Sequence, residues 1–350
     1  MGSYYLKKPV FIFGASLLTF SMAALVVLIL FWPQSNPRDV VKLSVKAGET
    51  LGDISQRLFD KKVISNQRMF RWAVQLMGKE TEIPVGTFKL VDANSNYKII
   101  EQLVYGSPEI KKVRLLEGWS VEQIADQINK VMGLSKDEIL SLSNDYRFLK
   151  NHDIQASSIE GYLFPDTYHF FDGDTPHIIL SNLVDEYKKF WNDERRHRAD
   201  ELGLSEHDVV TLASIIEGEA IYDSERPTIS AVYHNRLNIG MRLQADPTIQ
   251  YIIDDGPRRL LNRDLRIKSP YNTYLHEGLP PGPINSPGEE SLLAALYPEE
   301  NEYLFFVAKG DGYHTFTKNE EEHNRAKKKF QKIRREVKRK NGKNEYKKIK

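Results

Sequence analysis

The sequence of 350 residues contains no cysteine, which excludes disulfide bridges, thiol nucleophiles and thiolate metal sites. Its nine histidines are scattered, and none forms the His-Glu-x-x-His pattern of a zinc enzyme. There is no glycine-rich phosphate-binding loop and no Gly-x-Ser-x-Gly nucleophile elbow. The composition therefore predicts neither a cofactor nor a metal site, and it leaves carboxylate chemistry as the main catalytic possibility.

Charge is missing from one long segment. Residues Val10 to Trp32 form an uncharged run of 23 residues, which is long enough as a helix to cross a hydrocarbon layer of about 30 Å. The run ends at Pro33 without the small-residue cleavage site of a signal peptide, so we predict a transmembrane helix at residues 10–32. Lys7 and Lys8 precede it, and the positive-inside rule then predicts a cytoplasmic N-terminus at residues 1–9. The expected localisation is the cell inner (cytoplasmic) membrane, single-pass, with the rest of the chain extracytoplasmic.

Downstream, strand and capping signals predict an α+β protein whose first module covers residues 40–92. Its elements, in order, are a strand at 41–45, a helix opened by Thr50, a helix opened by Ser65 and a strand at 86–91. The opening of this module, Val45 to Leu51 followed by Ile54, resembles a LysM module. That resemblance implies binding of glycans that contain N-acetylglucosamine, and a packing domain that binds nothing is the alternative.

Three further regions follow this module. Residues 93–155 form a connecting α/β region, with a strand predicted at 110–116 and helices opened by Ser120 and Ser135. Residues 156–324 are predicted to form a mixed, mainly helical catalytic domain with short strands, in which the aromatic loop 160–168 lines a groove or caps the core. Residues 325–350 form a basic tail with 14 Lys/Arg against 2 Glu, either solvated or bound to an anionic lipid or polymer. Trp72 and Trp119 are predicted to be aromatic residues of the core or of a groove, with the core favoured.

Glu217 is the candidate catalytic residue. A capping box of Ser205 and Asp208 predicts the start of its helix, and Glu217 falls at the margin of the apolar stripe of that helix. Burial against hydrocarbon disfavours the charged carboxylate and so favours the protonated acid that a general acid requires. A glutamate at the solvent boundary is the alternative. Glu219 points about 160° away on the same helix, so the two carboxylates cannot flank one bond.

Polar loops rich in proline follow this helix. They combine hydrogen-bonding side chains with a rigid backbone, which suits recognition of a sugar polymer, although ordinary structural loops are equally consistent with the pattern. The segments concerned are Asn235 to Leu237, Gly240 to Thr248, Ser269 to Tyr274 and Gly278 to Ile284.

Together with Ile215 to Glu219, these segments form five ordered blocks that resemble the endolytic murein transglycosylase family (MltG, or YceG-like). The resemblance covers nearly the whole chain to about Asn324. It implies a membrane-anchored peptidoglycan lytic transglycosylase that cleaves the MurNAc-GlcNAc bond of nascent glycan strands and leaves 1,6-anhydroMurNAc ends. Glu217 matches the catalytic glutamate of the family and would act as general acid and then as general base.

The loop residues are expected to bind the substrate. They are Glu219, Asn235, Arg242, Gln244, Asp246, Tyr271, Asn272, Thr273 and Tyr274. Peptidoglycan strands, the cytoplasmic membrane and murein synthases are the implied partners, and no nucleic acid is expected. A two-carboxylate muramidase (hydrolase) and a non-catalytic peptidoglycan-binding scaffold are the alternatives.

Overall fold

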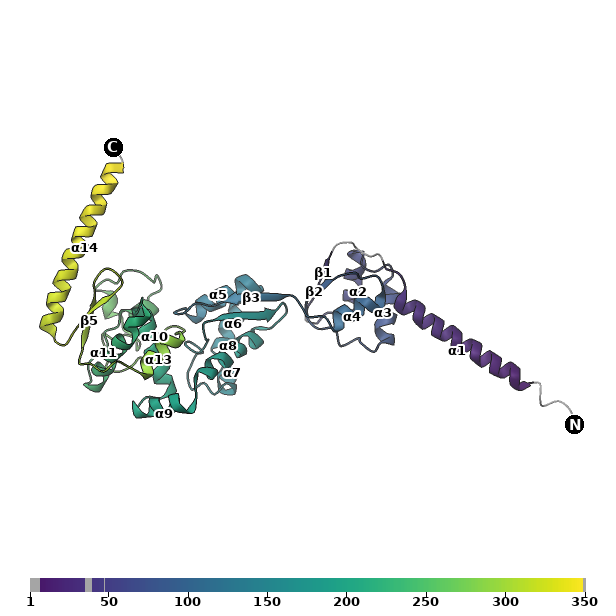
Figure 1. Cartoon of the computed structure of the whole chain (residues 1–350), viewed down its shortest axis with the longest axis horizontal. Coiled ribbons are helices and arrows are strands. Elements are labelled where there is room, and N and C mark those ends of the chain that lie inside the picture. Colours follow the sequence, from purple (N-terminus) through teal and green to yellow (C-terminus); the bar gives the residue numbers. More distant parts are fainter. Residues whose placement is uncertain (1–6, 35–39, 47, 349–350) are drawn as a thin grey trace. The chain divides into compact units, whose positions relative to one another are not determined.

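The computed structural model describes residues 7–34, 40–46 and 48–348 (Figure 1). The fold is of the α+β class, as predicted. The described part contains many helices and three two-stranded sheets. Two compact units divide the chain: unit 1 comprises Met1–Lys112 with His169–Thr175, and unit 2 comprises Val113–Tyr168 with Pro176–Lys350. Strand β3 (Ile110–Arg114) pairs with β4 (Thr167–Phe171), so the end of the predicted aromatic loop is a strand.

Helix α1 (Lys7–Phe31) covers most of the segment that we predicted to cross a membrane. Among the described residues, no helix reaches the length and hydropathy that a membrane span requires. The prediction of a transmembrane helix is therefore not confirmed by the structure. Most of the predicted cytoplasmic N-terminus, residues 1–6, lies outside the described residues.

Unit 1 has the βααβ order predicted for residues 40–92. Its elements are β1 (Val41–Val45), α2 (Leu51–Asp60), α3 (Gln67–Leu76) and β2 (Gly86–Leu90), followed by α4 (Asn96–Val104). The two strands are antiparallel, and Leu43 pairs with Phe88 inside the core. Helix α3 buries Phe70 on the opposite side from Trp72, so Trp72 is 54% exposed and the prediction of a core tryptophan is wrong.

The caps of these helices follow the sequence signals with one exception. Thr50 and Asp53 form the predicted capping box of α2. The cap of α3 is Asn66 rather than Ser65, because the Asn66 side chain accepts the amide of Met69. The amide and hydroxyl of Ser65 instead donate to Gln34.

Unit 2 is mainly helical. Its helices are α5 (Val121–Met132), α6 (Lys136–Ser143), α7 (Tyr146–Asn151), α8 (Pro176–Phe190), α9 (Asp193–Glu201), α10 (Glu206–Glu219), α11 (Arg226–Asn238), α12 (Asp246–Ile252), α13 (Glu289–Leu296) and α14 (Glu320–Lys348). Unit 2 also contains two short turns of 3-10 helix, η1 (Asp223–Glu225) and η2 (Asp264–Arg266), and an antiparallel hairpin of β5 (Phe305–Ala308) and β6 (His314–Thr317).

Three helix boundaries in unit 2 bear on the site. The chain after Pro176 forms two helices, α8 and α9, because the side chain of Asn192 caps the second one. Helix α12 begins at Asp246, so part of the segment Gly240 to Thr248, which we predicted to be a loop, is helical. Helix α13 begins after its N-cap, Gly288.

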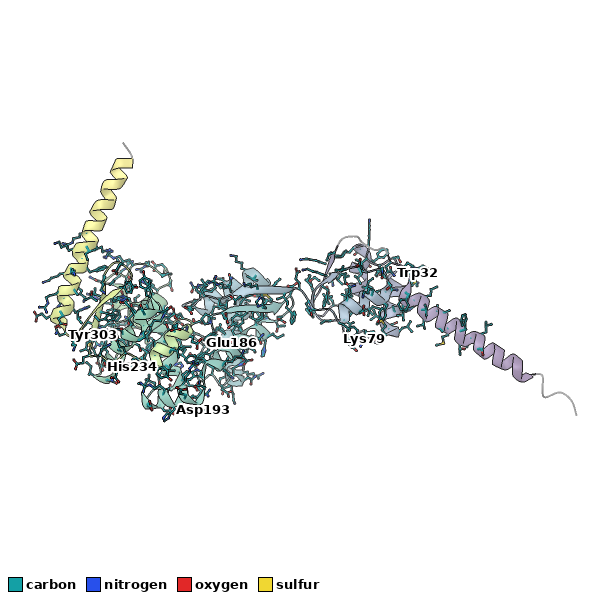
Figure 2. The ribbon with its side chains drawn as sticks, in the orientation of Figure 1. Trp32, Lys79, Glu186, Asp193, His234 and Tyr303 are labelled. Atoms are coloured by element: carbon teal, nitrogen blue, oxygen red, sulfur yellow. The ribbon has the colours of Figure 1, made fainter. Side chains whose placement is uncertain are left out.

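Helix α10 is the central helix of unit 2 and packs against α11, α12 and α13. Its capping box of Ser205 and Asp208 is present as predicted. All of residues 209–216 are buried, so the helix is surrounded on every side rather than along one stripe. His234, labelled in Figure 2, bonds the carbonyl of Ala295 and so fixes α11 to α13. The last turn of α10 is thereby held in a rigid frame.

Candidate functional site

Glu217 lies in the last turn of α10 and its side chain is only 7% exposed. Its Oε2 accepts the amide of Gly288 at 3.0 Å and the hydroxyl of Ser291 at 2.8 Å. Its Oε1 accepts Nη2 of Arg226 at 3.2 Å. The burial agrees with the prediction, but the groups around the carboxyl are hydrogen-bond donors rather than hydrocarbon.

Arg226 and the start of α13 together stabilise a negative charge on Glu217. The Arg226 side chain is 5% exposed, and it also donates to Ser291 at 2.6 Å and to Asp223 at 3.0 Å. Gly288 is the N-cap of α13, so the carboxylate of Glu217 lies at the positive end of that helix. Charge-assisted bonds of this kind are the strongest that a carboxylate forms. These donors therefore fix the position and orientation of the Glu217 carboxyl group.

A second acid, Glu117, lies beside the residues that bind Glu217, and it was not predicted from the sequence. An atom added to Gly288 in the Cβ position would lie 2.2 Å from Oε1 of Glu117, so this carboxyl contacts the residue whose amide binds Glu217. Gly118 has a φ of 74°, and a Cβ there would lie 3.6 Å from Cγ of Glu217. The Glu-Gly dipeptide before the Ser120 cap was the available signal, because a glycine with positive φ marks a sharp turn.

Glu219 belongs to a different cluster, as the helix geometry predicted. It accepts the hydroxyl of Tyr233 at 3.0 Å, while Tyr274 donates to Asp246 at 2.5 Å. Burial, and next the nearby charge of Asp246, raise the pKa of Glu219 to about 7. Glu219 and Asp246 are thus two interacting carboxyl groups of which one is readily protonated near neutral pH.

A cleft of about 990 Å³ lies beside these two groups of residues. Its lining includes Gly118, Glu160, Gly218, Glu219, Asp246 and Asn285. This volume is at the upper end of ordinary ligand sites and is large enough for several sugar rings. Gly118 and Gly218, the chain neighbours of Glu117 and Glu217, belong to the lining, whereas the two glutamates themselves do not.

Glu160 is the most deeply placed acid in the lining of the cleft, with 7% of its surface exposed. Both carboxyl oxygens accept the amide of Val121, at 3.0 and 3.2 Å, at the start of α5. Burial raises the pKa of Glu160 to about 8. Glu160 connects the aromatic segment 160–168 to α5 and is mainly protonated at neutral pH.

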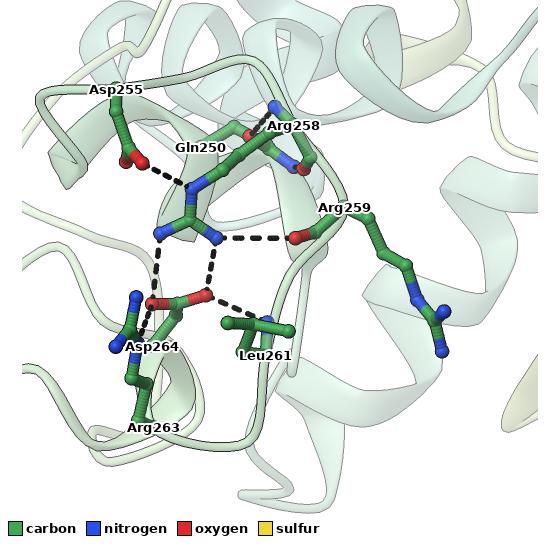
Figure 3. Close-up of polar contacts among 7 residues, drawn as sticks. All are labelled: Gln250, Asp255, Arg258, Arg259, Leu261, Arg263 and Asp264. Atoms are coloured by element: carbon green, nitrogen blue, oxygen red, sulfur yellow. Dashed lines mark hydrogen bonds and ion pairs between the residues drawn. The ribbon is translucent and has the colours of Figure 1, made fainter.

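The loop that follows α12 forms part of the lining of the cleft, and hydrogen bonds and ion pairs of Arg258 hold this loop together (Figure 3). Arg258 donates to both oxygens of Asp264, at 2.7 and 3.1 Å, and to Asp255 at 2.7 Å. The hydrogen bond from Arg258 holds the pKa of Asp264 down at about 2. The side-chain oxygen of Gln250 accepts a hydrogen bond from the amide of Arg258 at 3.0 Å, which connects the loop to α12. Residues 254, 256 and 257 of this loop line the cleft.

Comparison with known sequences agrees with this arrangement. A sequence model of the YceG-like family matches residues 43–329. The chain belongs to the YceG-like family. The match extends over both units and includes all the residues of the candidate site.

Several relatives of this YceG-like chain carry a functional name. The endolytic murein transglycosylase of Bacillus subtilis is 32% identical over 312 residues, which cover 85% of this chain and 86% of the relative. The endolytic murein transglycosylase of Streptococcus pneumoniae is 24% identical over 83% of this chain and 58% of its own length. The crystal structure of a putative YceG-like protein from Listeria monocytogenes is 33% identical, with a TM-score of 0.57, and covers 83% of this chain and 99% of that one.

The predicted binding residues of this YceG-like chain divide into two groups. Glu219 and Asp246 line the cleft, and Tyr274 contacts Asp246. The other group holds the loops together: Asn235 donates to the carbonyls of Asn301 and Tyr303, Asn272 donates to those of Leu265 and Ile267, and Thr273 accepts the amide of Ala245. Asn272 and Thr273 are buried, which leaves them little surface for a ligand.

The remaining three predicted binding residues lie close to this framework. Gln244 is exposed, has a φ of 47°, and its amide donates to the carbonyl of Thr273. Arg242 is exposed and reaches the carbonyl of Tyr274 at 3.5 Å. Tyr271 is half-buried against Tyr251 of the cleft lining, with ring centroids 5.0 Å apart. Of these, Tyr271 has a ring next to the cleft.

Proposed function

We propose that this YceG-like protein is an endolytic peptidoglycan lytic transglycosylase that cleaves the MurNAc-GlcNAc bond of nascent glycan strands. The observation that carries the proposal is the Glu217 carboxyl group, which is buried, bound by three donors and directly followed in the chain by Gly218 and Glu219 of the cleft lining. The names of the relatives support lytic transglycosylase activity on murein.

The reaction needs two proton transfers and no water. The 6-hydroxyl of the MurNAc residue attacks its own anomeric carbon, the bond to the GlcNAc oxygen breaks, and a 1,6-anhydro ring closes. The 6-hydroxyl loses its proton to a base, and the leaving oxygen gains a proton from an acid. The sequence resemblance assigns both roles to Glu217. The three donors around Glu217 support the role of base.

The cleft is the proposed binding site for the glycan strand. Glu219 and Asp246 supply hydrogen-bonding groups for sugar hydroxyl and N-acetyl groups, and Tyr271 and Tyr251 supply aromatic rings for the apolar faces of sugars. We also propose that the βααβ module of unit 1 binds the same polymer outside the cleft. Murein synthases are proposed as partners, because the substrate is a nascent strand.

The membrane remains the proposed location. Apolar side chains of α1 are exposed in the part of the helix whose side chains are described, including Leu18 at 70%, Phe20 at 74% and Leu25 at 56%. A contiguous apolar surface of this kind requires an apolar environment. We propose that residues 10–32 anchor the chain in the cytoplasmic membrane, with both units extracytoplasmic.

A muramidase is the second candidate, and the proximity of Glu117 to Glu217 favours it, because hydrolytic glycosidases use two carboxyl groups. The products separate the two reactions. Purified protein is incubated with murein, and the new ends are analysed by mass spectrometry. Anhydro ends support the proposed function, whereas reducing ends, heavier by one water, would establish the hydrolase.

A further inference from the structure

Two stacked tyrosines form an exposed aromatic surface that the proposed function has not yet used. The ring centroids of Tyr222 and Tyr313 lie 4.2 Å apart, with 20° between the ring planes. Each residue is 39% exposed, so part of the pair faces solvent. A pair of rings is a contiguous apolar surface, unlike a single exposed side chain, and such a surface is typical of a binding site.

Buried contacts hold together the two segments that carry this tyrosine pair. Tyr222 directly precedes η1, and Tyr313 directly precedes β6. Behind the rings, Glu225 of η1 accepts the backbone amide of His314 at 2.9 Å and contacts Nδ1 of its ring at 2.9 Å. The side chains of Glu225 and His314 are each 10% exposed. The two rings are therefore held in place before a ligand arrives, which lowers the entropy cost of binding.

The tyrosine pair lies next to the residues that bind Glu217. Asp223, which follows Tyr222 in the chain, accepts a bond from Arg226 at 3.0 Å, and Arg226 donates to Glu217 at 3.2 Å. Neither tyrosine belongs to the lining of the cleft, which includes Gly218 on the other side of Glu217 in the connection. The cleft and the tyrosine pair thus adjoin the residues around Glu217 separately and share no lining residue.

The chemistry of this surface suits a sugar ring. A sugar has an apolar face of C–H groups, which packs on an aromatic ring, and hydroxyl groups at its rim, which need hydrogen-bond partners. Asp311 contacts both tyrosines, because its carbonyl accepts the hydroxyl of Tyr222 at 3.4 Å and its side chain accepts the amide of Tyr313 at 3.1 Å. Asp311 is exposed, and the Asp223 side chain is 70% exposed. Two carboxyl groups are therefore available beside the rings for sugar hydroxyl groups.

We propose that Tyr222 and Tyr313 form a sugar-binding platform for the part of the glycan strand that lies outside the cleft. This inference rests on the proposed function, because an enzyme that cuts within a strand must hold sugars on both sides of the cleaved bond. The cleft binds one part of the strand, and the exposed surface of the tyrosine pair binds a sugar ring of the other part by stacking. The platform positions a long strand across Glu217 and takes no part in proton transfer.

The test measures strand binding by the full-length Glu217→Gln protein, in which the strand should stay uncut. The probe is a long, fluorescently labelled murein strand without stem peptides, and fluorescence anisotropy gives the Kd. Tyr222→Leu and Tyr313→Leu, each added to this protein, keep an apolar side chain but remove a ring. Each should raise the Kd about 2- to 10-fold, because a stacking contact is lost. Tyr222→Phe keeps the ring and should leave the Kd unchanged.

Tyr146→Leu in the same protein is the matched control. Tyr146 is a tyrosine of α7 in unit 2 that is 72% exposed and does not line the cleft, so its loss should leave the Kd unchanged. Nitration of tyrosines with tetranitromethane, mapped by mass spectrometry, is a second readout that needs no change to the platform. The strand should protect Tyr222 and Tyr313 from nitration and leave Tyr146 reactive.

Three results would overturn the platform. They are an unchanged Kd in both leucine variants of the tyrosine pair, an equal rise in Kd for Tyr222→Phe or Tyr146→Leu, and equal nitration of the pair with and without the strand. The proposed function fails separately. A wild-type protein that forms no anhydro ends on murein, while strand binding still depends on the two rings, would overturn the activity and leave the platform in place.

Discussion

At the residue scale, the ion pair of Glu217 and Arg226 contributes to stability as well as to chemistry. Both side chains are almost fully buried, so removal of the arginine leaves a buried carboxylate without its counter-charge. We predict that Arg226→Met lowers the free energy of unfolding by about 3–5 kcal/mol. Denaturation with urea measures this change.

The matched control for that prediction is Arg196→Met. Arg196 pairs with Glu206 at 2.7 Å, but the two side chains are 47% and 44% exposed. A solvent-exposed pair of this kind contributes roughly 0–1 kcal/mol. Equal losses in the two variants would contradict the importance that we assign to the buried pair.

Glu160 makes stability depend on pH. The pKa of Glu160 is about 8 in the folded chain and near 4.5 in the unfolded chain, so only the folded state keeps this proton between those values. Stability from this source is therefore complete at acid pH and is lost as the pH rises towards 8. Relative to Glu160→Gln, the wild type should lose roughly 2–4 kcal/mol of unfolding free energy between pH 5 and 8.

Urea titrations of both proteins at several pH values measure that difference. Glu122→Gln, on the exposed face of α5, is the control and should keep the wild-type slope. A Glu160→Gln variant with the same slope as the wild type would show that Glu160 does not retain its proton in the folded chain.

At the element scale, the loop that Arg258 holds together forms part of the lining of the cleft. We predict that Asp264→Asn raises KM for murein roughly 5- to 10-fold, since one weakened charge-assisted bond lets the wall move, and leaves kcat unchanged. Steady-state kinetics measure both constants. Asp255→Asn removes a single bond from a carboxylate that is 67% exposed and should change KM much less. A fall in kcat alone would contradict this role of the loop.

Helix starts could be predicted from the sequence because their causes are local. The capping boxes of Thr50, Ser120 and Ser205 each lie within three residues of the amides they satisfy. The separation of Glu217 from Glu219 was predictable for the same reason. The start of α13 was not, because its amide at Gly288 binds Glu217, a residue far away in the chain.

Glu117, the second acid of the site, could not be predicted from the sequence for the same reason, since its position depends on contacts between residues far apart in the chain. Glu117 and Glu217 are a hundred positions apart in the chain, and the backbone bonds of Gly118 and Trp119 to Ser286 bring the turn after Glu117 close to the start of α13, where Gly288 binds Glu217. The division of the predicted binding residues also depends on packing: Asn272 and Thr273 have the side chains of a sugar site, but the folded loop uses them for its own backbone. Residue type identified the candidate binding residues. Only the tertiary contacts showed which of them line the cleft and which stabilise the loops.

At the scale of the whole molecule, α1 contributes to unit 1 and is also the proposed anchor. Ile29 belongs to the core of unit 1, and its carbonyl accepts the side chain of Asn96, so deletion of the helix would damage that unit. Leu18 and Leu25 are exposed and can be changed without entering the core. We predict that Leu18→Lys with Leu25→Lys moves the full-length protein from the membrane fraction to the soluble fraction, since each lysine costs about 2.5–3.5 kcal/mol in the hydrocarbon layer.

Fractionation of cells that express each protein measures this distribution. Glu122→Gln with Asp137→Asn, which also raises the net charge by two but lies in unit 2, serves as the control and should leave the protein in the membrane fraction. A wild-type protein in the soluble fraction would contradict the proposed anchor.

The central claim is that Glu217 catalyses formation of anhydro ends on murein. The most direct measurement is mass spectrometry of murein digested by the purified full-length wild type and by Glu217→Gln, with circular dichroism to confirm that both are folded. The account predicts 1,6-anhydroMurNAc ends from the wild type and a loss of about 10²–10⁴-fold in their rate of formation in the variant. Undiminished anhydro ends from a folded Glu217→Gln would contradict it.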